Sequence, residues 1–133
     1  MKILLTFLLM AFISGNAIVI KDQWLRPGAK KMATALYFTI ENNGSVADTL
    51  YSIDSDVSNM VQLHETYSNG SVTGMREIGQ VVINPGETVK LEPGGKHVMV
   101  MKLKKDLKIG KKVDFNLHFR KAGEMIITAQ VKE

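Results

Sequence analysis

The clearest feature of the chain is the alternation of apolar and polar residues in short stretches. In residues 34–40 the apolar positions Leu36, Phe38 and Ile40 alternate with other residues, and in residues 113–120 four apolar residues alternate with four polar ones. A period of two is typical of a β-strand that buries one face. We therefore expect strands over residues 34–40 and 113–119, each with one face toward a core.

Further short stretches fit the same pattern and are separated by turn residues. The additional strands are expected over residues 49–53, 61–67, 87–91, 97–101 and 125–131. Turn signals are Asn42-Asn43-Gly44, Asn84-Pro85-Gly86, Glu92-Pro93-Gly94-Gly95 and Ala122-Gly123. Seven or eight short strands without a convincing long helix predict a single-domain, all-β fold, an antiparallel β-sandwich.

Two of these strands are predicted to form a hairpin around Asn69-Gly70. This dipeptide favours a two-residue type I′ turn, because both central positions need positive φ. In that register His64 lies directly opposite Met75, with Cβ atoms roughly 5 Å apart. A bulge at Gly74 would disturb the register. His64 lies on the polar side of its strand, away from Leu63.

His97 and Met99 form a second pair, because residues i and i+2 of a strand share a face. Together the two pairs predict that His64, Met75, His97 and Met99 surround one soft metal ion. Thioether sulfur selects Cu(I), whereas zinc sites use Cys, His and carboxylate ligands and blue-copper centres need a Cys thiolate. The chain contains no Cys, so the pattern indicates a site that holds and passes on cuprous ion.

A metal-free interpretation stays open for the same residues. Methionine is commonly a core residue and a single histidine is commonly just hydrogen-bonded. Met101 shares the face of His97 and Met99, and we expect it to pack under the site. His118 is expected to be solvated, and Trp24 to be a core or site-wall residue. Packing or surface roles are expected for Met32, Met60 and Met125.

The amino terminus has the pattern of a secretory signal peptide. Lys2 precedes an apolar run from Ile3 to Ile13, and Gly15 and Ala17 follow at the positions of a cleavage site. We expect residues 1–17 to be the signal peptide and residues 18–133 the mature domain. No Cys follows the signal, so we expect no lipoprotein anchor and no stable membrane insertion after cleavage.

Charge adds little, because the formal net charge is only +4. Six lysines lie between residues 102 and 112, and they indicate either a docking surface for an acidic acceptor or a charged loop that blunts a sheet edge. These lysines lack interleaved aromatic residues, which argues against nucleic acid. Without Cys and with three His, the chain offers no redox pair or dinuclear copper–zinc centre, and no spacing suggests a catalytic triad. We expect no enzyme activity.

The spacing H-x10-M-x21-H-x-M resembles the motif of the PCuAC family of periplasmic copper chaperones. Several further segments also resemble this family over the whole mature chain: Asp22-Gln-Trp-Leu-Arg26, Val61-Gln-Leu-His-Glu65, Gly74-Met-Arg76, Leu91-Glu-Pro-Gly-Gly95 and Phe119-Arg-Lys-Ala-Gly123. Two departures are Thr66 and Val72, where many members have further methionines. The His/Met-rich carboxyl-terminal tail of some members is also missing, so we expect one site.

The resemblance implies a cupredoxin-like (Greek-key) β-sandwich that binds one Cu(I) per chain through His64, Met75, His97 and Met99. It also implies delivery of copper to the CuA site of cytochrome c oxidase or a related respiratory oxidase. We expect the protein to be a monomer in the periplasm. The expected partner is the copper-acceptor domain of that oxidase or its assembly factor. Two alternatives stay open: a periplasmic copper-sequestering or resistance protein, and a metal-free secreted interaction module.

Overall fold

The computed structural model describes residues 17–133, and the predicted signal peptide lies outside this range except for Ala17. Ten strands make up the described chain: β1 (Ile18–Leu25), β2 (Thr34–Asn42), β3 (Asp48–Asp54), β4 (Met60–Ser68), β5 (Thr73–Glu77), β6 (Val81–Ile83), β7 (Thr88–Leu91), β8 (Lys96–Met101), β9 (Lys112–Phe119) and β10 (Gly123–Val131). Within these residues, we find no helix with the length and apolar character needed to cross a membrane.

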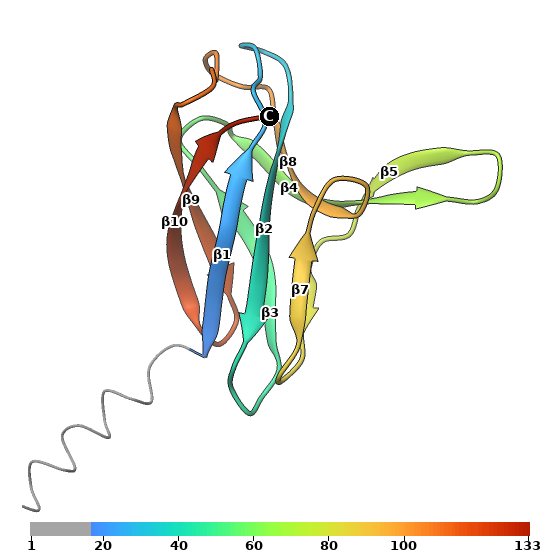
Figure 1. Cartoon of the computed structure of the whole chain (residues 1–133), viewed down its shortest axis with the longest axis vertical. Coiled ribbons are helices and arrows are strands. Elements are labelled where there is room, and N and C mark those ends of the chain that lie inside the picture. Colours follow the sequence, from blue (N-terminus) through green and yellow to red (C-terminus); the bar gives the residue numbers. More distant parts are fainter. Residues whose placement is uncertain (1–16) are drawn as a thin grey trace, which may run out of the picture.

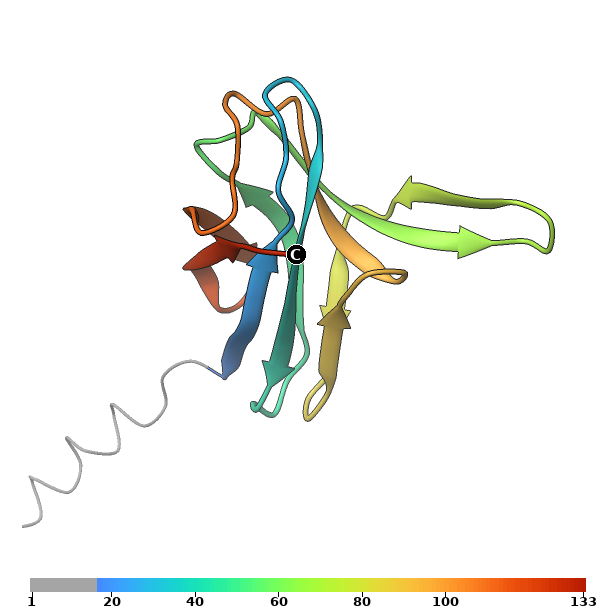
Figure 2. The same ribbon diagram turned by 45° about the horizontal axis from the view of Figure 1, so that its top comes forward.

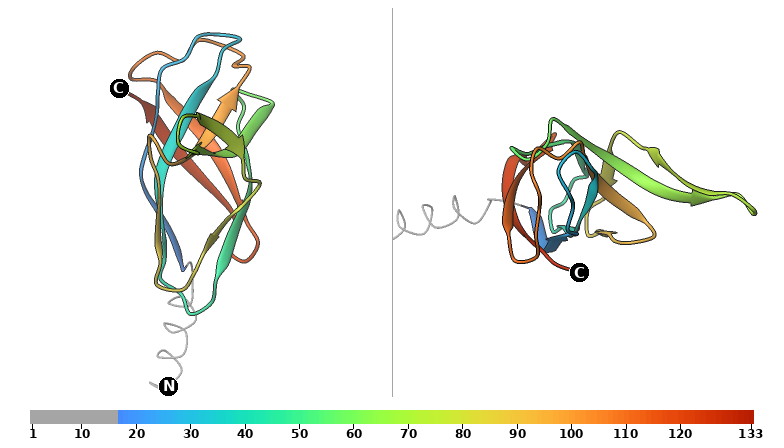
Figure 3. Two further views of the ribbon diagram at one scale, coloured as in Figure 1. Left: turned by 90° about the vertical axis from the view of Figure 1, so that its right-hand side faces the viewer. Right: turned by 90° about the horizontal axis from the view of Figure 1, so that it is seen from above.

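The strands form one sheet that curls back on itself. Its order is β5-β4-β8-β2-β1-β10-β9-β3-β6, and β7 pairs with the half of β2 that β8 leaves free. Figure 1 shows the two halves facing each other, and the view from above in Figure 3 shows the sheet wrapped around its interior. The predicted all-β single domain is confirmed. Its pairings are antiparallel as predicted, except that β1 runs parallel to β10.

The predicted strands are present, whereas β1 was missed. Its alternation is broken by a register shift between Lys21 and Trp24, and Asp22 has a φ of 60°. Such a bulge interrupts the period of two that identifies a strand in the sequence. The predicted total of seven or eight strands was therefore too low, because β1 and the three-residue β6 escape the pattern.

The inner face of the curled sheet carries the hydrophobic core. Phe38, Phe115 and Phe119 are its largest fully buried side chains, and Leu63 of β4 and Val98 of β8 belong to it. The apolar residues that alternate in residues 34–40 and 113–119 are thus the ones buried against the opposite half of the sheet. Because successive side chains point to opposite faces, the neighbours of Leu63 and Val98 lie on the outer face.

The β4–β5 hairpin projects from the body of the molecule, as Figure 2 shows. β5 is one edge of the sheet and β6 is the other. The six lysines between residues 102 and 112 lie mainly in the loop between β8 and β9, two strands in the interior of the sheet order. The interpretation that these lysines blunt a sheet edge is therefore wrong.

Candidate metal centre

His64 and His97 face each other across the β4–β8 ladder. They are direct Cα partners in the antiparallel register, and their ring centroids are 5.9 Å apart. Both lie on the outer face, because their neighbours Leu63 and Val98 point into the core. Two imidazoles from segments far apart in the sequence therefore meet on one face, as the sequence predicted for a shared site.

One ring nitrogen of His97 is committed to the backbone and the other is free. Nδ1–H donates to the Gly95 carbonyl oxygen at 3.1 Å. Nε2 is buried and has no hydrogen-bond partner. Because a carbonyl oxygen can only accept, the proton of the neutral ring sits on Nδ1 and Nε2 carries a lone pair. The same carbonyl oxygen accepts the Thr66 N–H at 3.1 Å, which ties the turn before β8 to β4.

His64 shows the same division of roles with the nitrogens exchanged. Its Nε2–H donates to Gln62 Oε1 at 3.0 Å, and its Nδ1 is buried without a partner. Burial lowers the pKa of His64 from 6.5, and the nearby His97 lowers it further, against an opposing effect of Glu77. The imidazole is therefore kept neutral, the form in which a histidine can bind a metal.

Met99 continues the same face one step along β8. Its partners are Gln62 on β4 and Ala35 on β2, and its side chain is half-buried. Residues two apart on a strand point the same way, so Met99 and His97 share the outer face as predicted. Gln62, which orients His64, lies directly opposite Met99.

Met75 lies on the face of His64, but not directly opposite it. Its partner on β4 is Thr66, whereas His64 pairs with Glu77. The predicted direct pairing of His64 with Met75 is wrong by two residues. A shift of two leaves every side chain on its face, so Met75 becomes the diagonal neighbour of His64, a relation that spans about 7–8 Å. The Met75 side chain is 60% exposed.

The physical reason for the shift is the hairpin loop. Ser68 pairs with Thr73, and the Asn69 N–H donates to the Val72 carbonyl oxygen at 3.0 Å, which closes a four-residue loop. Gly70 has a φ of 91°, but Asn69 is not among the residues with positive φ. A type I′ turn needs positive φ at both positions, so the predicted turn does not form. The register runs unbroken past Gly74, without the bulge that was considered there.

The opposite face of the hairpin is held by a small cluster. Arg76 pairs with Glu65 at 2.8 Å, and its guanidinium lies 4.9 Å from the centroid of the Tyr67 ring. Gly74 leaves room for this ring, because a Cβ there would come within 3.0–3.2 Å of it. These contacts hold the two strands of the projecting hairpin together. They lie on the face of the hairpin opposite to Met75.

Three residues that support the histidines were missed by sequence reasoning. Gln62 and Gly95 accept hydrogen bonds from the two rings, and Glu77 lies opposite His64. Gln62 could have been identified, because it is two residues before His64 on the same face of one strand. Glu77 was missed because the predicted register placed Met75 in its position.

Two other predictions about single residues are corrected by the structure. His118 is not a solvated side chain, because its Nε2 lies 2.7 Å from Asp54 and its Nδ1 3.4 Å from Glu124, and only 18% of the side chain is exposed. Of the two roles expected for Trp24, the core role is wrong, and the site-wall role stays a prediction. Trp24 packs on Tyr37 at 4.9 Å between ring centroids, and the core residue of this segment is its neighbour Leu25.

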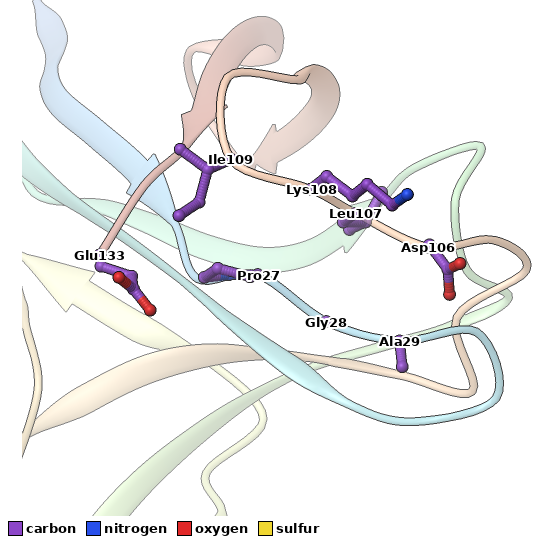
Figure 4. Close-up of a pocket in the computed structure, with 8 residues that line it drawn as sticks. All are labelled: Pro27, Gly28, Ala29, Asp106, Leu107, Lys108, Ile109 and Glu133. Atoms are coloured by element: carbon purple, nitrogen blue, oxygen red, sulfur yellow. The ribbon is translucent and has the colours of Figure 1, made fainter.

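A hollow of about 720 Å³ lies elsewhere, between the β1–β2 and β8–β9 loops and the carboxyl terminus. Figure 4 shows its lining, which is Pro27, Gly28, Ala29, Asp106, Leu107, Lys108, Ile109 and Glu133. It contains no His or Met. Asp106 accepts the Lys30 N–H at 2.8 Å and so joins the two loops. The candidate metal centre is thus a surface of the sheet rather than this hollow.

The donor atoms on this surface are two imidazole nitrogens with free lone pairs and neighbouring thioether sulfurs. Within residues 17–133, His, Asp and Glu side chains nowhere form a group of three that could hold a metal ion. Met75 and Met99 carry thioether sulfurs on the same face as His64 and His97. Such a neutral donor set of nitrogen and thioether sulfur suits a soft, singly charged cation.

Comparison with known proteins gives one family match and several relatives. The family model "Putative lipoprotein LpqE-like" matches residues 18–131. Protein Lxx21020 of Leifsonia xyli subsp. xyli (strain CTCB07) is 29% identical over 119 residues, which cover 89% of this chain and 71% of the relative. Protein RP573 of Rickettsia prowazekii (strain Madrid E) is 26% identical over 113 residues, which cover 81% of this chain and 62% of the relative.

Solved structures of PCuAC domains are similar over nearly the whole described chain. The apo PCuAC domain from PmoF1 has a TM-score of 0.74 at 27% identity and covers 90% of this chain and 96% of that chain. The copper-bound PCuAC domain from PmoF2 has a TM-score of 0.74 at 28% identity, with 90% and 95% covered. The solution structure of CuI-DR1885 from Deinococcus radiodurans has a TM-score of 0.68 at 27% identity, with 88% and 80% covered.

The predicted cupredoxin-like fold is confirmed by these likenesses, which span the curled sheet from β1 to β10. With a family match over residues 18–131 and the architecture of the PCuAC domains of PmoF1, PmoF2 and DR1885, the chain belongs to the LpqE-like family and is of the PCuAC type.

Proposed function

We propose that the protein is a Cu(I)-binding metallochaperone with His64, Met75, His97 and Met99 as its ligands. The observation that carries this proposal is the pair of opposed imidazoles, each with one buried nitrogen that has no hydrogen-bond partner. A buried polar atom without a partner costs free energy, so it is expected where it serves a ligand. Copper in the related PmoF2 domain and Cu(I) in DR1885 support this choice of metal.

Delivery of the bound ion is the second part of the proposal. Met75 is 60% exposed on a hairpin that projects from the body, so an acceptor's ligands can reach the ion before the donor's ligands leave. We propose the periplasm as the location and the CuA site of cytochrome c oxidase, or a related respiratory oxidase, as the destination. The partner is then the copper-acceptor domain or its assembly factor, and the carrier acts as a monomer.

Binding rather than catalysis is part of the same proposal. The ligands are neutral thioethers and imidazoles, and they hold Cu(I) without a thiolate that copper could oxidise, since the chain has no Cys. The competing function is copper sequestration by the same site. A transfer assay with the apo copper domain of an oxidase separates the two, because a carrier metallates the acceptor faster than free copper does and a buffer protein does not.

The ligand set is tested by titrating the purified protein with Cu(I) and recording X-ray absorption at the copper edge. We expect a first shell of nitrogen and sulfur, and the sulfur contribution should fall in Met75→Leu and Met99→Leu. Met125→Leu is the matched control, because Met125 packs against the core away from the histidines. A shell of nitrogen and oxygen alone, or an unchanged shell in both ligand variants, would overturn the assignment and favour a metal-free interaction module.

A further inference from the structure

Three methionines gather on the outer face of the β4–β8 ladder, beside the histidine pair. Met60 is the direct partner of Met101, and Met99 precedes Met101 by two residues on the same face. No spacing in the sequence links Met60 with another candidate ligand, because Met60 and Met101 are far apart along the chain. Strand pairing brings them together, so that successive positions on this face carry the His64–His97 pair, Met99 and then the Met60–Met101 pair.

These methionines are not core residues. Met60 is 37% exposed, and Met99 and Met101 are half-buried. None of the three belongs to the hydrophobic core or to the side chains that pack against it. The residues of these strands that face the core are Val61, Leu63, Val98 and Val100. Packing in the core, the role that methionine commonly has, therefore does not explain the three thioethers.

The backbone around the Met60–Met101 pair is fixed by a buried serine. The Ser58 hydroxyl lies against the Met101 carbonyl oxygen, accepts the Met60 N–H at 2.9 Å and lies 3.2 Å from the Met60 carbonyl oxygen. Ser58 is only 3% exposed. It therefore pins the start of β4 to the end of β8, and the two opposed Cβ atoms are held about 4.5–5.5 Å apart.

Met99 lies between the two pairs. Residues two apart on a strand are separated by about 6.6 Å along the strand, so Met99 is one such step from His97 and one from Met101. Its flexible side chain has three rotatable bonds, which allow its sulfur to approach either pair. A soft cation bound to Met60 and Met101 can therefore gain the Met99 thioether before it reaches the histidines.

We propose that Met60, Met99 and Met101 form a second, thioether-only Cu(I) site that exchanges the ion with the histidine pair through Met99. The inference rests on the proposed function in that Met99 is shared with the proposed His/Met centre. The ion stays Cu(I), and each step exchanges one sulfur or nitrogen ligand for another. Because thioethers are neutral and carry no proton, no electron or proton moves when the ion binds to this second site.

The test uses Ag(I), a soft cation without redox chemistry, and the purified protein labelled with 13C at the methionine methyl groups. In the wild-type protein we expect the first equivalent of Ag(I) to shift the methyl signals of Met75 and Met99. The second equivalent should shift those of Met60 and Met101. In His64→Gln the first equivalent should already shift Met60, Met99 and Met101.

The two proposals fail separately in this experiment. If the Met60 and Met101 signals stay fixed up to two equivalents while Met75 and Met99 respond, the second site is wrong and the proposed function stands. If only Met60, Met99 and Met101 respond, and His64→Gln changes nothing, the His/Met centre is wrong and the thioether site stands.

A double variant gives an independent measurement. Met60→Leu combined with Met101→Leu should reduce the number of Ag(I) ions bound per chain from two to one, measured by equilibrium dialysis. Met32→Leu combined with Met125→Leu is the matched control and should still bind two. Circular dichroism verifies that both double variants are folded, as expected because leucine conserves the methionine volume. Two ions bound by the folded Met60/Met101 variant would overturn the proposal.

Discussion

His97 and His64 each use one ring nitrogen for a fixed hydrogen bond and leave the other nitrogen without a partner. The acceptors differ, because His97 donates to the Gly95 carbonyl oxygen and His64 donates to Gln62 Oε1. Hydrogen bonds of this kind fix the tautomer and the orientation of a ring that binds a metal. At the scale of the residue, the proposed copper affinity therefore depends on Gln62 as well as on the four ligands.

Replacing Gln62 by leucine removes the acceptor of the His64 Nε2–H and keeps a side chain of similar size. We expect Cu(I) affinity to fall by roughly 10–100-fold, the usual effect of losing a partner that orients a ligand. Competition with a chromophoric Cu(I) chelator measures this change. Gln130→Leu is the control, because Gln130 is an exposed residue of β10, and it should leave the affinity unchanged. Equal affinities for the two variants would show that Gln62 does not position His64.

Protons should compete with Cu(I) at His64. Burial and the neighbouring His97 lower the pKa of His64 from 6.5, so the ring is neutral at pH 7 and protonation competes only below 6.5. We expect Cu(I) affinity to be constant from pH 8 to pH 7 and to fall as the pH drops through the lowered pKa. His64→Gln should show a shallower fall in the same chelator competition. A wild-type affinity that stays flat down to pH 5 would contradict histidine ligation.

At the scale of the element, the turn before β8 connects backbone geometry to the site. Gly94 has a φ of 87°, and the Gly95 N–H donates to the Glu92 carbonyl oxygen at 3.0 Å, as predicted for Pro and Gly at the centre of this turn. The Gly95 carbonyl oxygen then accepts from both Thr66 and His97. A change in the backbone conformation of this turn is therefore expected to alter the hydrogen bond that orients the His97 ring.

A comparison of two glycines tests this connection. Gly94→Ala introduces a side chain at positive φ and should cost about 1–2 kcal/mol of unfolding free energy, together with a loss of Cu(I) affinity. Gly86→Ala is the matched control, because Gly86 occupies the same position of the Asn84-Pro85-Gly86 turn, has a φ of 76° and also faces open space. It should cost a similar free energy and leave copper binding unchanged, as measured by urea denaturation and chelator competition. If Gly94→Ala left the copper affinity unchanged, the conformation of this turn would not influence the proposed metal site.

At the scale of the whole molecule, one curled sheet carries both the core and the proposed site. β9 and β10 complete the core, whereas β4, β8 and β5 carry the candidate ligands on the outer face. The parallel pairing of β1 with β10 joins the two halves. Stability therefore comes mainly from the inner face, and metal binding comes from the outer face.

Core and surface positions on the β9–β10 pair should differ sharply in their effect on stability. Phe115 is fully buried, so Phe115→Ala should lower the free energy of unfolding by about 3–5 kcal/mol. Ile126 is 73% exposed, so Ile126→Ala should change it by less than about 0.5 kcal/mol. Urea denaturation compares the two. Similar losses would mean that the inner face of these strands is not the core of the folded protein.

Alternation in the sequence by itself determined most of the strands, but not β1 and β6. It also determined the inner and outer faces of β2, β4 and β9 and the i/i+2 relation of His97 to Met99, because these depend only on the period of a strand. The register of the β4–β5 hairpin could not be predicted from the sequence, because Asn69-Gly70 is compatible with a two-residue loop and with a four-residue loop. Only the four-residue loop pairs Thr66 with Met75. The opposition of His64 with His97 and of Met60 with Met101 was decided by tertiary structure alone. A ladder between strands far apart in sequence is selected by burial of Leu63 and Val98 in a common core, a relation that local patterns do not contain.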